Sequence, residues 1–121
     1  MRPIVLLGIA AVMLVAGCGS SGPSSAQDVV QRFSDAGLSV PSPRDNSHNC
    51  DELQLGCIEF VTTESVTVMR FADETAAKEG ASAYGKDTYQ QGVYVLSFGA
   101  QRTPEDQRRR FTSELNRMVG E

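Results

Sequence analysis

The sequence predicts an α+β protein with a small three-stranded, mainly antiparallel sheet and helices packed on one face of it. Two observations lead to this fold class. β-Branched and aromatic residues gather in short runs at 57–62, 65–71 and 93–98, a composition typical of strands. Apolar residues recur at helical spacing in three other segments that start at capping residues. The expected order is α-β-β-α-β-α, with the helices layered against the sheet.

The first helix is expected at 26–36. Ser25 and Asp28 have the spacing of a capping box, in which a hydroxyl accepts from a first-turn amide. Apolar residues then follow at helical intervals. Gly37 suits the left-handed conformation that ends many helices.

The runs 57–62 and 65–71 are predicted to pair as a hairpin, because only two residues separate them. Asp73 is expected to cap a second helix that ends at Gly85. Small residues on one side of this helix would let it lie close to the sheet. The third strand, at 93–98, is apolar on both faces, which is typical of a strand that is well covered.

The last helix is expected to begin at 103–106, where Pro104 suits the first helical position and two acids follow it. Four apolar residues then form its buried stripe, and Gly120 closes it. They are Phe111, Leu115, Met118 and Val119.

Composition limits the function classes. The chain has 121 residues, one histidine and a formal net charge of −4. This length suits one folded domain. The acidic balance argues against a nucleic-acid partner, because phosphate binding draws on a surplus of lysine and arginine. A single histidine excludes most catalytic designs that need a histidine pair, and no motif indicates a cofactor, so the protein is not expected to be an enzyme.

The N-terminal segment has the features of an export signal. Arg2 precedes the apolar run 4–15, which is too short to span a bilayer comfortably as a helix. The run ends at Val15-Ala16-Gly17-Cys18, which resembles the lipobox of bacterial lipoproteins. That resemblance implies that residues 1–17 are a signal peptide. An uncleaved membrane helix and a plain signal peptide are the alternatives.

The same resemblance implies a lipid anchor at Cys18, whose sulfur would receive a diacylglyceryl group carrying acyl chains such as palmitate. Two acyl chains anchor a protein stably, whereas one chain binds a membrane only marginally. Membrane lipid is therefore one expected partner, and the expected location is the extracytoplasmic side of the cell membrane. Residues 18–25, rich in glycine and serine, are expected to be a tether, and 26–121 the α+β domain.

Cys50 and Cys57 are predicted to form a disulfide, because an exported chain meets an oxidising environment. Closing so short a loop would stabilise the domain by about 2.5 kcal/mol in the chain-entropy model. A zinc site with His48 is the alternative, although no fourth ligand is indicated.

The segment between Val40 and Cys57 is the candidate binding loop, because binding residues concentrate on loops held by a rigid scaffold. Several charged side chains lie close together in it, and prolines limit its freedom. The residues singled out are Arg44, Asp45, His48, Asp51 and Glu52. A solvated loop without a binding role is the alternative.

In architecture and composition the chain is similar to small lipoproteins of high-GC bacteria. The expected function is that of a membrane-anchored extracytoplasmic lipoprotein whose domain binds a ligand or an envelope protein without catalysis. An accessory or inhibitory lipoprotein acting on an envelope enzyme or on phage entry is the alternative. A deep polar pocket would favour a small ligand, and a flat apolar patch would favour a protein partner.

Overall fold

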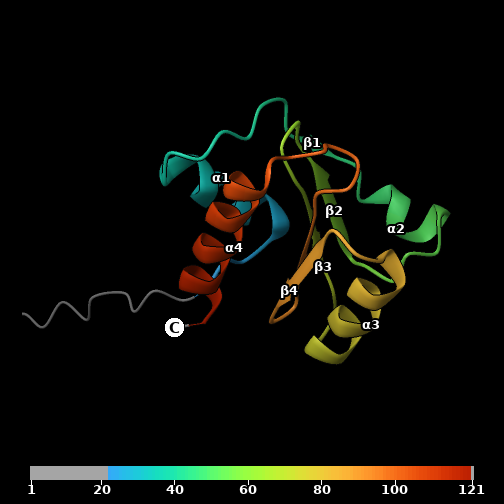
Figure 1. Ribbon diagram of the computed structural model, residues 1–121. Coiled ribbons are helices and arrows are strands. Elements are labelled where there is room, and N and C mark those ends of the chain that lie inside the picture. The colour runs from blue at the N-terminus through green and yellow to red at the C-terminus, as the bar shows by residue number, and fades with distance from the viewer. Residues whose placement is uncertain (1–21, 121) are drawn as a thin grey trace, which may run out of the picture.

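The computed structural model describes residues 22–120 of the chain. Helices and strands alternate irregularly along this part (Figure 1). The elements are α1 (Ala26–Asp35), β1 (Arg44–Asp45), α2 (His48–Glu52), β2 (Glu59–Thr62), β3 (Thr67–Arg70), α3 (Glu74–Tyr84), β4 (Thr88–Gln91), β5 (Tyr94–Ser97) and α4 (Glu105–Val119).

The strands form one sheet in the order β1-β2-β3-β5-β4, and every neighbouring pair is antiparallel. The predicted hairpin is present, with Phe60 opposite Met69. β5 lies between β3 and β4 and runs antiparallel to both, so α3 connects two strands that run in the same direction. A tight turn at Gly92, whose φ is 59°, joins β4 to β5.

The sheet is covered by helices on both faces (Figure 1). One face carries α1 and α4, whose Phe33 and Phe111 rings meet edge to face at 4.9 Å. The core on this side includes Val61, Val68 and Leu96 from the strands. The other face carries α3 against β4 and β5, and α2 against β2. Its smaller core consists of Cys50, Cys57, Phe60, Met69, Phe71, Ala77 and Val95.

This arrangement corrects the prediction of helices on one face. In each central strand, successive side chains point to opposite faces, and both sets are apolar. Val61 and Val68 point to the α1–α4 side, whereas Phe60 and Met69 point to the α3 side. Two apolar faces require two covering layers.

The sheet also has five strands instead of the predicted three, so the predicted element order is wrong in detail. The two missed strands lie at the edges. β1 is only two exposed residues, and β4 (Thr-Tyr-Gln-Gln) is half-buried and mostly polar. Neither shows an apolar pattern. An edge strand is held by backbone hydrogen bonds to one neighbouring strand, so its side chains need not be buried. The one-turn helix α2 has no periodicity to detect.

The predicted helix ends are largely confirmed. The Ser25 side chain accepts from the Asp28 amide at 3.0 Å, and Asp73 accepts from the Ala76 amide at 2.8 Å. Gly37 has a φ of 86°, the left-handed conformation expected after α1. Pro104 is the residue that precedes α4, one position earlier than predicted. Among the described helices, none combines the length and apolar character needed to cross a bilayer.

Candidate functional site

The predicted binding loop contains two short elements of regular structure. Arg44 and Asp45 form β1, which pairs with Thr62 and Val61 of β2. His48 begins α2, which also contains Asp51 and Glu52. All five predicted residues are exposed. The segment is thus an edge strand followed by a helix, and its role in binding stays a prediction.

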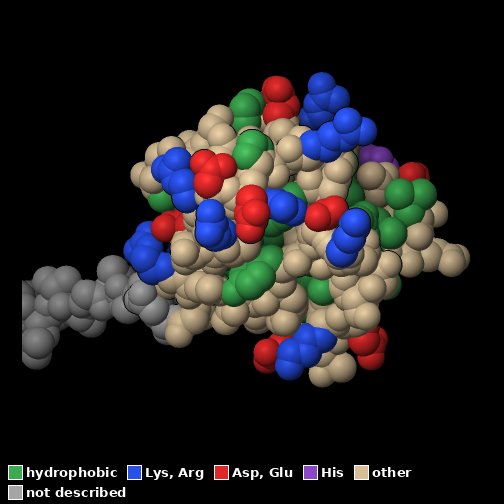
Figure 2. Space-filling view, in the orientation of Figure 1, with side chains coloured by type: hydrophobic (Ala, Val, Ile, Leu, Met, Phe, Trp, Pro, Cys, Tyr) green, Lys and Arg blue, Asp and Glu red, His purple; other side chains and the backbone are tan. Residues whose placement is uncertain are grey.

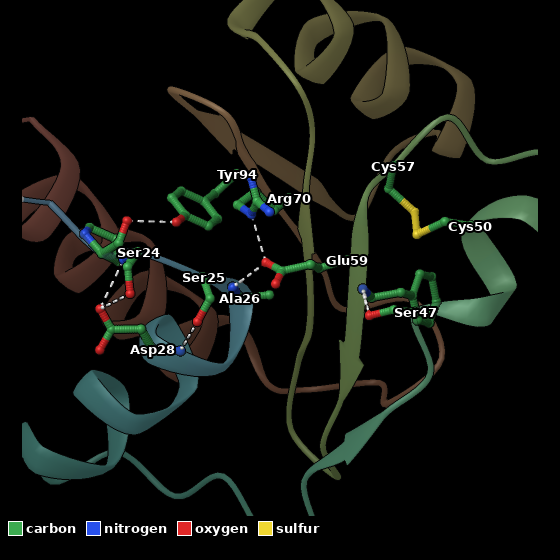
Figure 3. Close-up of polar contacts among 12 residues, drawn as sticks. Ser24, Ser25, Ala26, Asp28, Ser47, Cys50, Cys57, Glu59, Arg70 and Tyr94 are labelled. Atoms are coloured by element: carbon green, nitrogen blue, oxygen red, sulfur yellow. Dashed lines mark hydrogen bonds and ion pairs between the residues drawn. A yellow bond between two sulfur atoms is a disulfide. The ribbon is translucent and has the colours of Figure 1, made fainter.

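The carboxylate of Asp45 holds the turn between β1 and α2. Its Oδ1 accepts from the Ser47 amide at 2.9 Å and from the Ser47 hydroxyl at 2.5 Å. These hydrogen bonds from Ser47 lower the pKa of Asp45 below its ordinary value. The Ser47 Oγ in turn accepts from the Phe60 amide at 3.1 Å (Figure 3). Asp45 therefore positions the segment against β2.

The predicted disulfide between Cys50 and Cys57 is confirmed (Figure 3), with 5.1 Å between the two Cα atoms. It joins α2 to the start of β2, and both cysteines are buried in the smaller core. Within residues 22–120, no three acidic, histidine or cysteine side chains come together in a group that could hold a metal ion.

The N-terminal end of the described chain is attached to the sheet (Figure 3). The Tyr94 hydroxyl donates to the Pro23 carbonyl at 2.8 Å, and burial raises the pKa of Tyr94, which keeps this donor protonated. The Ala26 amide and the Arg70 Nε both donate to Glu59 Oε1, at 2.8 and 2.7 Å. We call these five residues the N-terminal attachment. Pro23 to Ser25, assigned above to the tether, thus contact the domain or cap α1.

A row of hydroxyls crosses the opposite end of the sheet, on the face that carries α3. Thr62 lies opposite Thr67, Thr67 opposite Ser97, and Ser97 opposite Thr88. Neighbouring strands lie about 4.8 Å apart, so the four side chains form a continuous hydroxyl row. Arg44 extends the same row at the β1 edge.

A cleft of about 600 Å³ opens over the hydroxyl row. The C-terminal end of α3 forms one wall with Tyr84, and the connection to β4 adds Lys86 and Asp87. The loop after β5 supplies Gly99, Ala100 and Gln101, and Phe60 also lines the cleft. The volume is in the range of small-molecule sites.

Gln101 lines this cleft, and only the nitrogen of its side-chain amide makes hydrogen bonds in the described chain. Its Nε2 donates to the Thr63 carbonyl at 3.1 Å and to the Thr67 hydroxyl oxygen at 2.9 Å. A carbonyl can only accept, which fixes which end of the amide is nitrogen. Gln101 Oε1 is buried and has no hydrogen-bond partner in the described chain. A buried polar atom without a partner costs about 1–3 kcal/mol, which is unusual in folded proteins.

The charges at the cleft rim nearly balance. Lys86 and Asp87 adjoin each other, and Asp87 pairs with Arg108 of α4 at 3.0 Å. Basic and acidic side chains are also interspersed over the surface that carries α4 (Figure 2). The cleft therefore has no strong field of one sign.

The sequence did not reveal this site. Thr62, Thr67 and Ser97 lie within predicted strands, where threonine and serine side chains give no indication of a site. Thr88 belongs to the missed strand β4. Only the register of β2, β3, β5 and β4 aligns the four hydroxyls, and register depends on long-range pairing.

No family model matches this chain, and neither a curated protein nor a solved structure matches it.

Proposed function

We propose that the chain is a lipid-anchored extracytoplasmic protein that binds a small ligand in the cleft over the hydroxyl row. The observation that carries the binding role is the row of four aligned hydroxyls, all of which line the cleft. Such a row offers several hydrogen-bonding groups to one ligand.

The role is binding without catalysis. The sole histidine of the sequence, His48, is on α2 and does not line the cleft. The hydroxyls of the row therefore have no imidazole base to activate them as nucleophiles. Asp87, the carboxylate in the cleft, is engaged by Arg108.

The proposal of a lipid anchor depends on the motif Val15-Ala16-Gly17-Cys18, which lies outside the described residues. The Cys50–Cys57 disulfide supports export, because such bonds persist in oxidising compartments. From Cys18 to Pro23 the chain spans at most about 18 Å, at up to about 3.6 Å per residue. A domain of about 100 residues has a radius of gyration of about 13 Å, so the anchor would keep the N-terminal attachment close to the lipid.

The cleft would then face away from the membrane. Tyr94 of the N-terminal attachment begins β5, and Ser97 of the hydroxyl row ends it. These two positions are separated by about 10 Å along the strand and point to opposite faces of the sheet. A ligand outside the membrane would reach the cleft without passing the anchor.

Fractionation of expressing bacteria tests the anchor. We expect the wild-type chain in the membrane fraction and Cys18→Ser in the soluble fraction, with the Cys50–Cys57 bond intact by peptide mapping. Ser20→Ala serves as the control and should remain with the membrane. Retention of Cys18→Ser in membranes would show that 4–15 anchors the chain as a helix and that the lipobox interpretation is wrong.

A further inference from the structure

We propose that the ligand of the cleft is a neutral saccharide, that is, a ring carrying several hydroxyls and no charge. This inference rests on the proposed binding function. Three properties of the cleft support it: its open hydrogen-bonding capacity, its charge and its aromatic wall.

The hydroxyl row offers donors. Thr62 Oγ1 accepts from the Asn46 side chain at 2.9 Å, and Thr67 Oγ1 accepts from Gln101 at 2.9 Å. Each hydroxyl therefore keeps its proton for a ligand acceptor. The Ser97 hydroxyl has no hydrogen-bond partner in the described chain, so it is free to donate and to accept.

The same cleft offers acceptors. The Thr88 hydroxyl donates to the Gly85 carbonyl at 2.8 Å, so its oxygen lone pairs remain open. The Ser97 hydroxyl can accept as well. The ligand must therefore supply donors and acceptors at once.

This requirement selects among ligand classes. An ionised carboxylate has acceptors only, and an ammonium group has donors only. A carboxylate could not donate to the Thr88 oxygen, and an ammonium group could not accept from Thr62 or Thr67. Each saccharide hydroxyl both donates and accepts, so one ring can serve the whole row.

Charge and shape point to the same class. The hydroxyl row itself is uncharged, and Lys86 and Asp87 at the rim carry opposite charges, so the cleft presents no net charge to an ionic ligand. Tyr84 is 39% exposed at the cleft wall, and Phe60 adds an apolar surface. A flat apolar ring face can pack against the C–H face of a sugar ring through apolar burial and dispersion, while the sugar hydroxyls bond to polar neighbours.

Amide chemical-shift mapping tests the proposal on the full chain, expressed in a bacterium and purified in detergent. The neutral probes are cellobiose and N,N′-diacetylchitobiose. Digalacturonic acid is the charged counterpart of the same size, and acetyl-trialanine amide represents a peptide. We expect the neutral disaccharides to shift the amides of Thr67, Thr88, Ser97 and Gln101 in a saturable manner.

Two substitutions test the residues. Ser97→Ala should weaken disaccharide binding about five-fold, the effect of losing one hydrogen bond of about 1 kcal/mol. Gln101→Met should also weaken it, because Gln101 Nε2 donates to Thr67 Oγ1 and so leaves the Thr67 proton for the ligand. Thr75→Val, a hydroxyl removal at an exposed α3 position outside the cleft, should leave the affinity unchanged. An unchanged spectrum of each free variant shows that it is folded.

The outcomes separate the two proposals. If only digalacturonic acid shifts the cleft amides, the neutral character of the ligand is overturned, and if only the peptide shifts them, the saccharide class is overturned; in both cases ligand binding in the cleft stands. If no probe shifts these amides, or if the disaccharides shift only residues elsewhere, both the saccharide inference and the cleft as binding site are overturned. Equal affinities of Ser97→Ala, Gln101→Met and wild type would overturn the role of the hydroxyl row.

Discussion

The carboxylate of Asp45 depends on its neighbour Ser47, and this pair can be tested by titration. Hydrogen bonds from Ser47 hold the pKa of Asp45 below its ordinary value of 3.8. The carboxylate therefore stabilises the fold at neutral pH, and this contribution is lost as the pH falls through the folded-state pKa. In Ser47→Ala we expect the pKa of Asp45 to rise, because the hydroxyl donor is lost, and acid unfolding to begin at a higher pH.

Carboxyl NMR signals followed against pH measure this directly. Asp28 is the internal control, since its pKa is lowered chiefly by the Ser24 amide and should not respond to Ser47→Ala. An unchanged pKa of Asp45 in the variant would contradict the assignment.

Glu59 joins three elements through one oxygen, which accepts from the Ala26 amide and from Arg70. Glu59→Gln keeps the shape and an acceptor but removes the charge. We expect it to lower the free energy of unfolding by about 1 kcal/mol, because hydrogen bonds to a charged group are the stronger kind. Urea unfolding measures the change. Glu79→Gln, at an exposed position of α3, is the matched control, and equal effects of the two would exclude the role given to Glu59.

At the scale of the element, the close approach of α3 to the sheet depends on Gly80. A Cβ at this position would lie 2.3 Å from Cζ of Phe71, which is 1% exposed. Alanine favours a helix by about 1 kcal/mol over glycine, but overpacking a core costs about 1–3 kcal/mol. Because the added Cβ would meet a buried ring, we expect the packing cost to exceed the gain in helix propensity and Gly80→Ala to destabilise the domain by up to about 2 kcal/mol in urea unfolding.

Two further variants separate packing from helix propensity. Phe71→Leu added to Gly80→Ala should cost less than the sum of the two single changes, because the smaller side chain relieves the clash. Ser82→Ala, exposed on the same helix, should change stability by less than about 0.5 kcal/mol. A Gly80→Ala variant as stable as wild type would show that α3 moves freely over Phe71.

At the scale of the whole molecule, the short link to Cys18 predicts an orientation on the membrane. Gly22, the β4–β5 turn and the last turn of α4 lie together, as Gly22 adjoins Met118 and Gly92 adjoins Val119. A fluorophore on Gln91→Cys should therefore be quenched more strongly by spin-labelled lipids than one on Lys86→Cys at the cleft rim. Equal or reversed quenching in vesicles would contradict an outward-facing cleft.

The sequence by itself determined the features that depend on neighbours along the chain. Caps at Ser25 and Asp73 and the left-handed Gly37 follow from local spacing, the Cys50–Cys57 bond follows from the two cysteines left in an exported domain, and all are present. The β2–β3 hairpin likewise follows from two apolar runs with a short connection.

Only the tertiary structure decided the edge strands, the second covering layer and the candidate site. β1 and β4 exist because a neighbouring strand offers hydrogen-bond partners, which leaves no apolar pattern in their own residues. The hydroxyl row needs Thr62, Thr67, Ser97 and Thr88 in one register, although Thr62 and Ser97 are 35 positions apart along the chain. Pairing between distant segments sets that register, because a shift of one residue would turn each side chain to the other face.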